Sequence, residues 1–221
     1  MAASPSSVTP SPLMPDAECS LCPRLQEFRH ANRAEYPGWH NAPVDSFGGL
    51  DAALLIVGLA PGLRGANQTG RPFTGDYAGD LLYATLAKFG FTMGAYAAHA
   101  DDGLALVNCR ITNAVRCVPP QNKPIGAEVN ACRGFLEGEI GSLKNLKMIL
   151  ALGGLAHGAV LTTLAEKKSA WKFGHQQFHH LPSGLILADS YHCSRYNTNT
   201  GRLTTTMFED VFRDIQAHLS G

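Results

Sequence analysis

The sequence predicts an α/β protein, built on a layered sheet that is parallel at its centre. Short apolar runs, two of them ending in glycine, are typical of buried strands. Segments with the apolar spacing of amphipathic helices follow these runs. Strands that alternate with helices favour a central parallel sheet covered by helices. Because ligands bind beyond the carboxyl ends of such strands, the polar loops that follow them are the first candidates for a site.

Composition favours one globular domain preceded by a tail. The chain has 221 residues, of which 45% are apolar and 16% charged, enough to bury a sizeable core. The first 16 residues, rich in Ala, Ser and Pro, predict a flexible tail, and residues 17–221 predict a single domain without an interior linker. The tail lacks the basic and apolar regions of a secretory signal, and no apolar run is long enough to span a bilayer. We therefore expect an intracellular, cytoplasmic protein that does not contact membranes.

Four strands are expected, each from a local apolar pattern. Residues 54–58 form an apolar run that ends in Gly58, and residues 148–153 repeat that pattern before Gly153. The other two expected strands cover residues 104–115 and 185–188. Polar loops follow three of the four strands, at residues 59–76, 118–124 and 192–203.

Five helices are expected between and after the strands. Residues 19–34 carry two cysteines, and residues 78–89 have the helical spacing of Leu82, Leu86 and Phe89. Residues 127–143 and 155–165 are the next two segments with helical character. The last helix is expected to begin after the Thr-rich cap at Thr204, with Phe208, Val211, Phe212, Ile215 and Leu219 on one face.

Six cysteines in an intracellular chain favour metal or cluster binding over disulfides. Cys19 and Cys22 form a C-x2-C pair, whose turn brings two thiolates to one centre. Cys117 and Cys132 can complete a four-thiolate site, and zinc and iron–sulfur clusters both accept such a set. Four unrelated buried thiols are the alternative. We expect Cys109 and Cys193 to pack in the core instead.

Five motifs, in order, resemble the uracil-DNA glycosylase superfamily, and the similarity runs from Cys19 to the C-terminus. These motifs are Gly58–Gly62, Thr69–Asp76, Ile111–Cys117, Pro119–Pro124 and the segment from Ser190 to Thr204. The chain most resembles family 5 (UDGb). Its sister, family 4, carries an acidic residue directly after the first glycine, where this chain has Leu59.

The resemblance implies a three-layer α/β/α sandwich around a mostly parallel sheet of four strands. It also implies a [4Fe–4S] cluster on Cys19, Cys22, Cys117 and Cys132. DNA containing uracil or other deaminated bases would be the partner, and we expect a monomer associated with the nucleoid. In family 5 the loop aspartate, here Asp76, takes the water-handling role that the acid after the glycine has in family 4.

A pocket for a flipped base needs an aromatic face, polar groups for the base edge and a donor for the leaving base. We expect Phe73 to stack on the base, Asn113 to pair with it and the backbone of Gly58, Leu59 and Ala60 to approach it closely. The alternatives are that Phe73 packs in the core and that the Asn113 amide hydrogen-bonds backbone groups of its loop.

Three further residues are predicted to be catalytic. His192 would donate a hydrogen bond to the departing base, where negative charge develops. Asp76 would position or activate water, although an aspartate before a helix is also a common N-cap. Asn122 would assist water or substrate, and a turn role is the alternative.

Contacts to DNA are expected mainly from the loop 194–202. Arg195 or Tyr196 would fill the gap that the flipped base leaves, since other proteins insert wedges in this way. Further contacts are expected from Ser194, Lys123, Arg202, Arg71, Arg64 and Arg116. A formal net charge of +0 predicts only weak non-specific affinity for DNA.

Together these features predict a monofunctional DNA glycosylase for base excision repair. It would excise uracil, hypoxanthine and xanthine hydrolytically and leave an abasic site, because no lysine is obviously placed as an imine-forming nucleophile. Lys123 is the one candidate against this prediction. A non-enzymatic iron–sulfur or zinc DNA-binding module is the alternative function.

Overall fold

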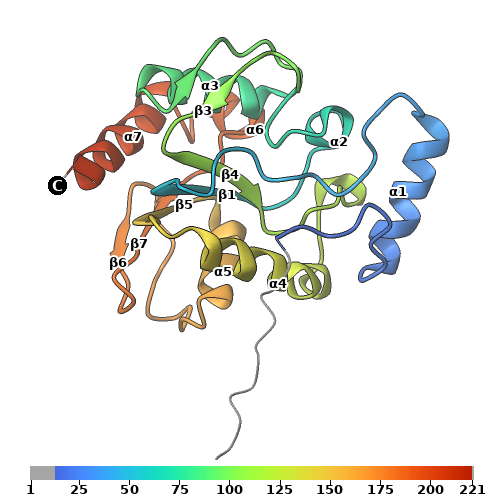
Figure 1. The fold of residues 1–221 in the computed structure, drawn as a ribbon. Helices are drawn as coiled ribbons and strands as arrows, with labels where there is room; N and C mark the ends of the chain where they lie inside the picture. The colour runs from blue at the N-terminus through green and yellow to red at the C-terminus, as the bar shows by residue number, and fades with distance from the viewer. Residues whose placement is uncertain (1–12, 221) are drawn as a thin grey trace, which may run out of the picture.

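A computed structural model describes residues 13–220, and a mostly parallel sheet of five strands forms its centre (Figure 1). The strand order is β4-β1-β5-β7-β6. The four parallel strands are β1 (Leu54–Gly58), β4 (Cys109–Asn113), β5 (Met148–Leu152) and β7 (Ile186–Ser190). All four fall within or beside the segments expected to be strands, so the α/β prediction is confirmed.

Two details of the strand prediction were wrong. A fifth strand, β6 (Phe178–His180), pairs antiparallel with β7 at the edge of the sheet. It has three residues, two of them histidines, so it leaves no apolar run to detect. The expected strand 104–115 is interrupted at Asn108, which has a φ of 50°. Its first part, β3 (Ala105–Leu106), instead pairs with β2 (Thr92–Met93) in a separate two-stranded sheet.

The expected helices are present, with small shifts at their ends. They are α1 (Pro23–Glu35), α3 (Tyr77–Lys88), α4 (Gly126–Ser142), α5 (Gly154–Thr163) and α7 (Thr205–Ser220). The loops contain short helical turns that the sequence did not predict: α2 (Ala66–Thr69), the 3-10 turn η1 (Pro120–Asn122) and α6 (Arg195–Asn199).

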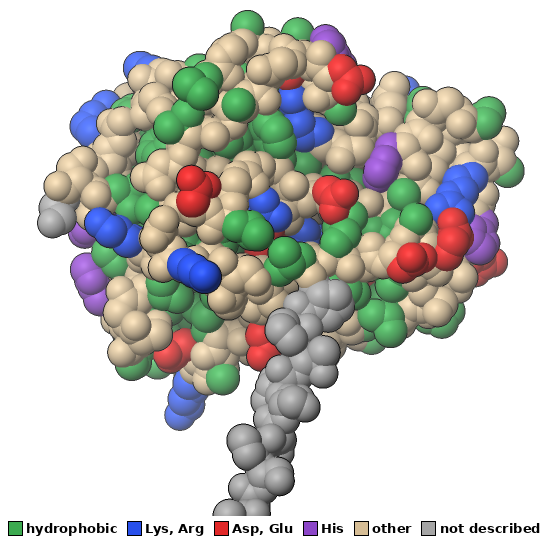
Figure 2. Space-filling view, in the orientation of Figure 1, with side chains coloured by type: hydrophobic (Ala, Val, Ile, Leu, Met, Phe, Trp, Pro, Cys, Tyr) green, Lys and Arg blue, Asp and Glu red, His purple; other side chains and the backbone are tan. Residues whose placement is uncertain are grey.

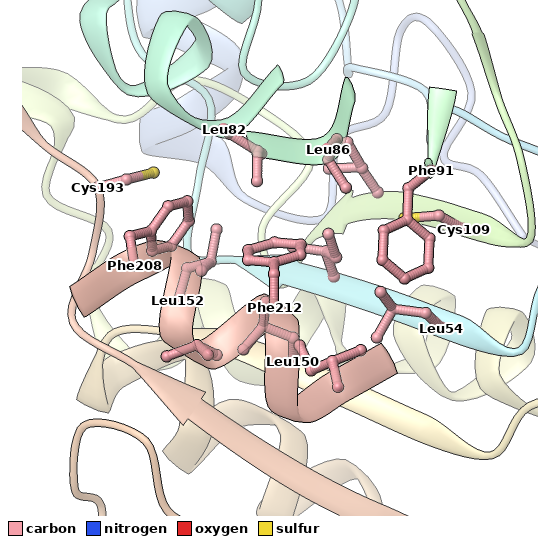
Figure 3. Close-up of a cluster of buried hydrophobic side chains, with 14 of the residues drawn as sticks. Leu54, Leu82, Leu86, Phe91, Cys109, Leu150, Leu152, Cys193, Phe208 and Phe212 are labelled. Carbon is pink, nitrogen blue, oxygen red and sulfur yellow. The ribbon is translucent and has the colours of Figure 1, made fainter. Parts of the chain in front are cut away.

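Helices cover both faces of the sheet and give the three layers. In Figure 1, α3 and α7 lie on one side of the sheet, and α4 and α5 lie on the other. Because successive strand residues point to opposite faces, Leu54 and Ile56 belong to one core cluster while Leu55 and Val57 belong to the other. Figure 3 shows the first cluster, in which Phe212 of α7 lies over the sheet.

The first twelve residues of the predicted tail lie outside the described part of the chain. Within the described part, no helix combines the length and apolar character needed to cross a membrane. Figure 2 shows acidic and basic side chains interspersed on the face turned to the viewer, as the balanced composition suggests.

Candidate active site

A pocket of about 760 Å³ opens at the carboxyl edge of the parallel sheet. Loops that follow β1, β4, β5 and β7 supply its walls. Among its lining residues are ten that the sequence nominated: Leu59, Ala60, Arg64, Phe73, Asp76, Asn113, Asn122, His192, Ser194 and Arg195. The parallel fold therefore gathers at one edge residues that are spread over more than a hundred positions of the chain.

Phe73 and Asn113 line one wall of the pocket, and Gly58 packs against both of them without lining it. A Cβ on Gly58 would lie 2.7 Å from Cζ of Phe73 and would also collide with Oδ1 of Asn113, so only glycine permits this approach. Phe73 has a φ of 51°, a strained conformation for a bulky residue that is typical of functional sites. No described residue hydrogen-bonds the Asn113 amide. This wall thus presents an aromatic ring beside an unengaged amide.

Asp76 performs the N-cap role and also faces the pocket. Its Oδ1 accepts a hydrogen bond from the Gly79 N–H at 3.0 Å, which caps α3. Its Oδ2 points toward Gly62 and Gly65, where a Cβ on Gly65 would lie 2.9 Å from the carboxyl carbon. The cap fixes the carboxylate and leaves its second oxygen free for a water molecule.

His192 follows the end of β7 and lines the pocket beside Phe73. Its ring centroid is 6.0 Å from that of Phe73. Burial lowers the pKa of His192, and the negative charge of Asp76 only partly opposes the shift. The imidazole is therefore neutral near pH 7, with one nitrogen able to donate. Its backbone carbonyl accepts from the Asn197 amide at 2.8 Å, which ties the His192 loop to α6.

The other nominated lining residues shape the rim. Asn122 Oδ1 accepts from the Leu63 N–H at 3.1 Å and so joins the loops after β1 and β4. Ser194 caps α6, and its hydroxyl accepts from the Asn197 N–H. The Arg195 guanidinium lies 5.3 Å from the centre of the Tyr77 ring, within cation–π range.

The assignment of Arg71 to DNA binding was wrong. Its side chain is 4% exposed and makes two hydrogen bonds of 2.7 Å to Asp102. The centres of the Phe47 and Tyr83 rings lie 5.0 and 5.3 Å from the Arg71 guanidinium carbon. A guanidinium enclosed in this way cannot reach a phosphate, and Arg71 instead anchors the loop that carries Phe73.

Arg116 is buried as well, in an ion pair with Glu139 at 2.5 Å, so it is not a phosphate contact either. Lys123, Tyr196 and Arg202 are exposed near the site without lining it. Tyr196 is 74% exposed, and the Arg202 guanidinium lies 4.5 Å from the Tyr191 ring centre. These three stay available for the DNA contacts predicted for them.

The sequence reasoning missed the wall after β5. Residues 152–156 line the pocket, and a Cβ on Gly153 would lie 3.6 Å from Cβ of His192. The signal was present, because Gly153 and Gly154 follow a predicted strand and belong to the same sheet edge. Because glycine has no side chain, neither residue offered a chemical reason to nominate it.

The four nominated cysteines lie in one region, at the start of α1. Cys22, Cys117 and Cys132 share one cluster with Leu25 and Phe135. Burial raises the pKa of these three thiols, and the nearby Cys19 thiol adds to each shift. Cys109 and Cys193 are buried in the main core, as predicted.

One feature of the thiol group fits a polynuclear cluster. Arg29 is 1% exposed and donates to Sγ of Cys117 at 3.5 Å and to the Cys19 carbonyl at 2.9 Å, while its Nε has no partner. Arg29 forms no ion pair with a described carboxylate, although after Arg33 it helps to lower the pKa of the exposed Glu18 carboxyl. A thiolate-ligated cluster would place negative charge directly beside the buried guanidinium.

The cysteine sulfurs are not in close mutual contact. Within residues 13–220, no three cysteine sulfurs all lie within 4.8 Å of one another.

Comparisons with known proteins agree on one family. The model of the uracil DNA glycosylase superfamily matches residues 46–216. A type-5 uracil-DNA glycosylase of Thermus thermophilus is 44% identical over 89% of this chain and 91% of its own length. Proteins of the same name from Mycobacterium leprae and Pyrobaculum aerophilum are 42% and 37% identical, and each covers at least 86% of both chains.

Proposed function

The chain belongs to the uracil-DNA glycosylase superfamily, and within it to the type-5 enzymes; on that premise we propose that it excises uracil, hypoxanthine and xanthine from DNA by hydrolysis. Membership in this family identifies the chain as an N-glycosyl hydrolase that removes uracil in DNA repair, and it disfavours a non-enzymatic binding module. The wider base range, the hydrolytic route and the residue roles below are proposals, as is the extent of the catalytic domain, residues 17–221.

One observation carries the mechanism: Phe73, Asn113, Asp76 and His192 converge on one pocket from three separate segments, the loop after β1, the end of β4 and the loop after β7. The target nucleotide must leave the base stack to reach such a pocket. The flipped base stacks on Phe73, while the Asn113 amide pairs with its polar edge as donor and acceptor. The backbone of Gly58, Leu59 and Ala60 borders the base, and no acidic side chain at position 59 restricts which base enters.

Bond cleavage is assigned to His192, Asp76 and Asn122. As the bond from C1′ of the sugar to the base breaks, its electron pair stays on the base, and a neutral His192 donates a hydrogen bond to that charge. The Asp76 carboxylate stabilises the positive sugar and orients the water that adds to C1′, whose proton it accepts. Asn122 holds the water-bearing loop closed through Leu63.

A hydrolytic, monofunctional route agrees with the lining of the pocket. No lysine is among the described residues that line it. Lys123 is exposed outside it, and its carbonyl accepts a hydrogen bond from Arg24. Lys123 is therefore assigned to a phosphate contact, with Arg202 and Ser194, while Arg195 and Tyr196 approach the gap in the stack.

Cys19, Cys22, Cys117 and Cys132 are assigned to a [4Fe–4S] cluster, supported by the buried Arg29 that donates to Cys117. When bound, the cluster would cross-link the start of α1, the loop after β4 and α4. The protein would act as an intracellular monomer on DNA that contains deaminated bases.

Duplexes that carry one uracil, hypoxanthine or xanthine test the proposed reaction. We expect free base to be released from each, and strand breaks to form only after alkali treatment, because the product is an abasic site. A duplex with normal bases is the control. Strand cleavage before alkali, or borohydride trapping of a protein–DNA adduct, would contradict the monofunctional route; release of uracil alone would contradict the wide base range.

Metal removal tests the cluster. Protein purified without oxygen should be brown, contain iron and inorganic sulfide, and lose thermal stability when the iron is chelated, because metal binding is coupled to folding. Cys132→Ala should lose the colour, whereas Cys109→Ala, at a buried cysteine outside the group, should keep it. A colourless protein with one bound zinc ion would refute the assignment.

A further inference from the structure

A compact polar cluster lies behind the pocket wall that the sequence missed. It joins His157 of α5, His179 of β6 and Asp189 of β7, whose ligand-type atoms all lie within 4.8 Å of one another. Asp189 is fully buried, and His157 is 4% exposed. A carboxylate at this depth needs partners for both oxygens, because an unpaired buried charge is costly.

The contacts show which groups carry protons. His157 Nε2 lies 2.9 Å from the Trp171 carbonyl, which can only accept, so this nitrogen bears a hydrogen. His157 Nδ1 lies 2.7 Å from Asp189 Oδ1, and a lone pair there would face a carboxylate. Both nitrogens therefore donate, and His157 is an imidazolium. The second oxygen of Asp189 accepts from His179 Nε2 at 3.2 Å and from the Gly174 N–H at 3.4 Å.

Other charged groups around the cluster affect the pKa of His157, but none of those described replaces Asp189 as its partner. Burial acts to lower the pKa of His157, but the hydrogen bond and charge of Asp189 raise it overall, and Lys168 opposes the rise. Lys168 comes from the segment after α5, where its amino group lies near Gly158. Glu166, from the same segment, accepts from the Trp171 indole at 3.0 Å. Asp189 is the one carboxylate within hydrogen-bond distance of His157 among the described residues.

The pair connects two walls of the active site. On one side, the His157 N–H donates to the Gly153 carbonyl in the first turn of α5, and residues 152–156 line the pocket. On the other side, Asp189 lies three residues before His192 on the same strand end. The sheet ladder fixes β5 against β7, through Leu152 and Ser190, but it does not fix α5.

We propose that His157 is a positioning residue, whose ion pair with Asp189 holds the first turn of α5 against the strand that delivers His192. The inference rests on the proposed function, because the position it controls matters only if His192 assists base release. Deprotonation of His157 breaks the pair, so its contribution is complete below the ordinary histidine pKa of about 6.5 and is lost as pH rises through the higher folded-state value.

His157→Gln tests the proposal, since glutamine is neutral and cannot reproduce both hydrogen bonds. Single-turnover uracil excision should fall about tenfold at pH 7, because small misplacements of a catalytic group are costly, while affinity for the duplex changes little. The wild-type rate should decline at alkaline pH, and the variant should lack that decline. Asp189→Asn should reproduce both effects. His180→Gln, at an exposed histidine of β6 next to His179, should behave as wild type.

Each outcome separates this proposal from the proposed function. If the wild-type protein releases no uracil, the proposed function fails; if it does and His157→Gln keeps its rate and pH profile, the positioning role fails. A lower melting temperature with an unchanged rate for the folded fraction would also refute it, since that is a structural role alone. If added Zn²⁺ stabilises the wild type but not His157→Gln, the three residues form a metal site, and the proposed ion pair is refuted.

Discussion

Asp76→Asn is expected to lower the rate of uracil excision about a hundredfold or more, the scale of losing one transition-state contact. Asparagine caps helices as well as aspartate does, and its side-chain oxygen can still accept from the Gly79 N–H. The substitution therefore removes the negative charge and the proton acceptor while preserving the start of α3. Single-turnover kinetics with a uracil duplex at saturating enzyme measure the effect.

Asp80→Asn is the matched control, because Asp80 lies in the same first turn of α3 but is exposed and outside the pocket lining. It should excise uracil at close to the wild-type rate. If Asp76→Asn also does so while folding normally, the carboxylate does not handle water, and the N-cap is its entire role.

His192→Ala is expected to cause a loss of similar size, about a hundredfold or more, because it removes the donor assigned to the departing base. The effect should appear in the rate of base release and leave duplex affinity nearly unchanged. Since burial lowers the pKa of His192, the rate of His157→Gln, which lacks the His157 titration, should not rise as pH falls from about 7 to 6 through protonation of the His192 ring.

His180→Ala provides a comparison at an exposed histidine of β6, and it should retain activity. Rapid base release by folded His192→Ala would show that the leaving base is stabilised by another group. Weaker binding of the duplex with an unchanged rate at saturation would instead assign His192 to substrate binding.

The parallel core was predictable because its strands are apolar on both faces. Leu54–Gly58 and Met148–Leu152 are fully buried, so they appear in the sequence as continuous apolar runs. β6 was not predictable from such a pattern, because an edge strand of three residues, two of them histidines, has no apolar run to display. The left-handed Asn108, which divides the expected strand 104–115, also leaves no hydrophobic signal.

The site was predictable where chemistry and position coincided. Asp76, Asn113 and His192 are polar residues at strand ends or in the adjoining loops, and the parallel sheet brings such positions together. Arg71 was misassigned because a sequence does not show whether an arginine in a loop points outward. Its partner Asp102 lies 31 residues away, and only the fold brings the two together.

The ion pair of His157 and Asp189 was hidden for the same reason. These residues are 32 positions apart, one within an apolar helix and the other within an apolar strand. Neither stands in a polar loop, so nothing in the local sequence distinguished them from isolated buried residues.

A crystal structure of Asp76→Asn bound to a uracil-containing duplex would test the central claim most directly, because the slow variant should retain intact substrate. We expect the uracil to be flipped into the pocket, stacked on Phe73 and paired with the Asn113 amide. A nitrogen of His192 should lie about 2.7–3.1 Å from the base oxygen O2. Uracil bound outside this pocket, or with O2 turned away from His192, would contradict the account.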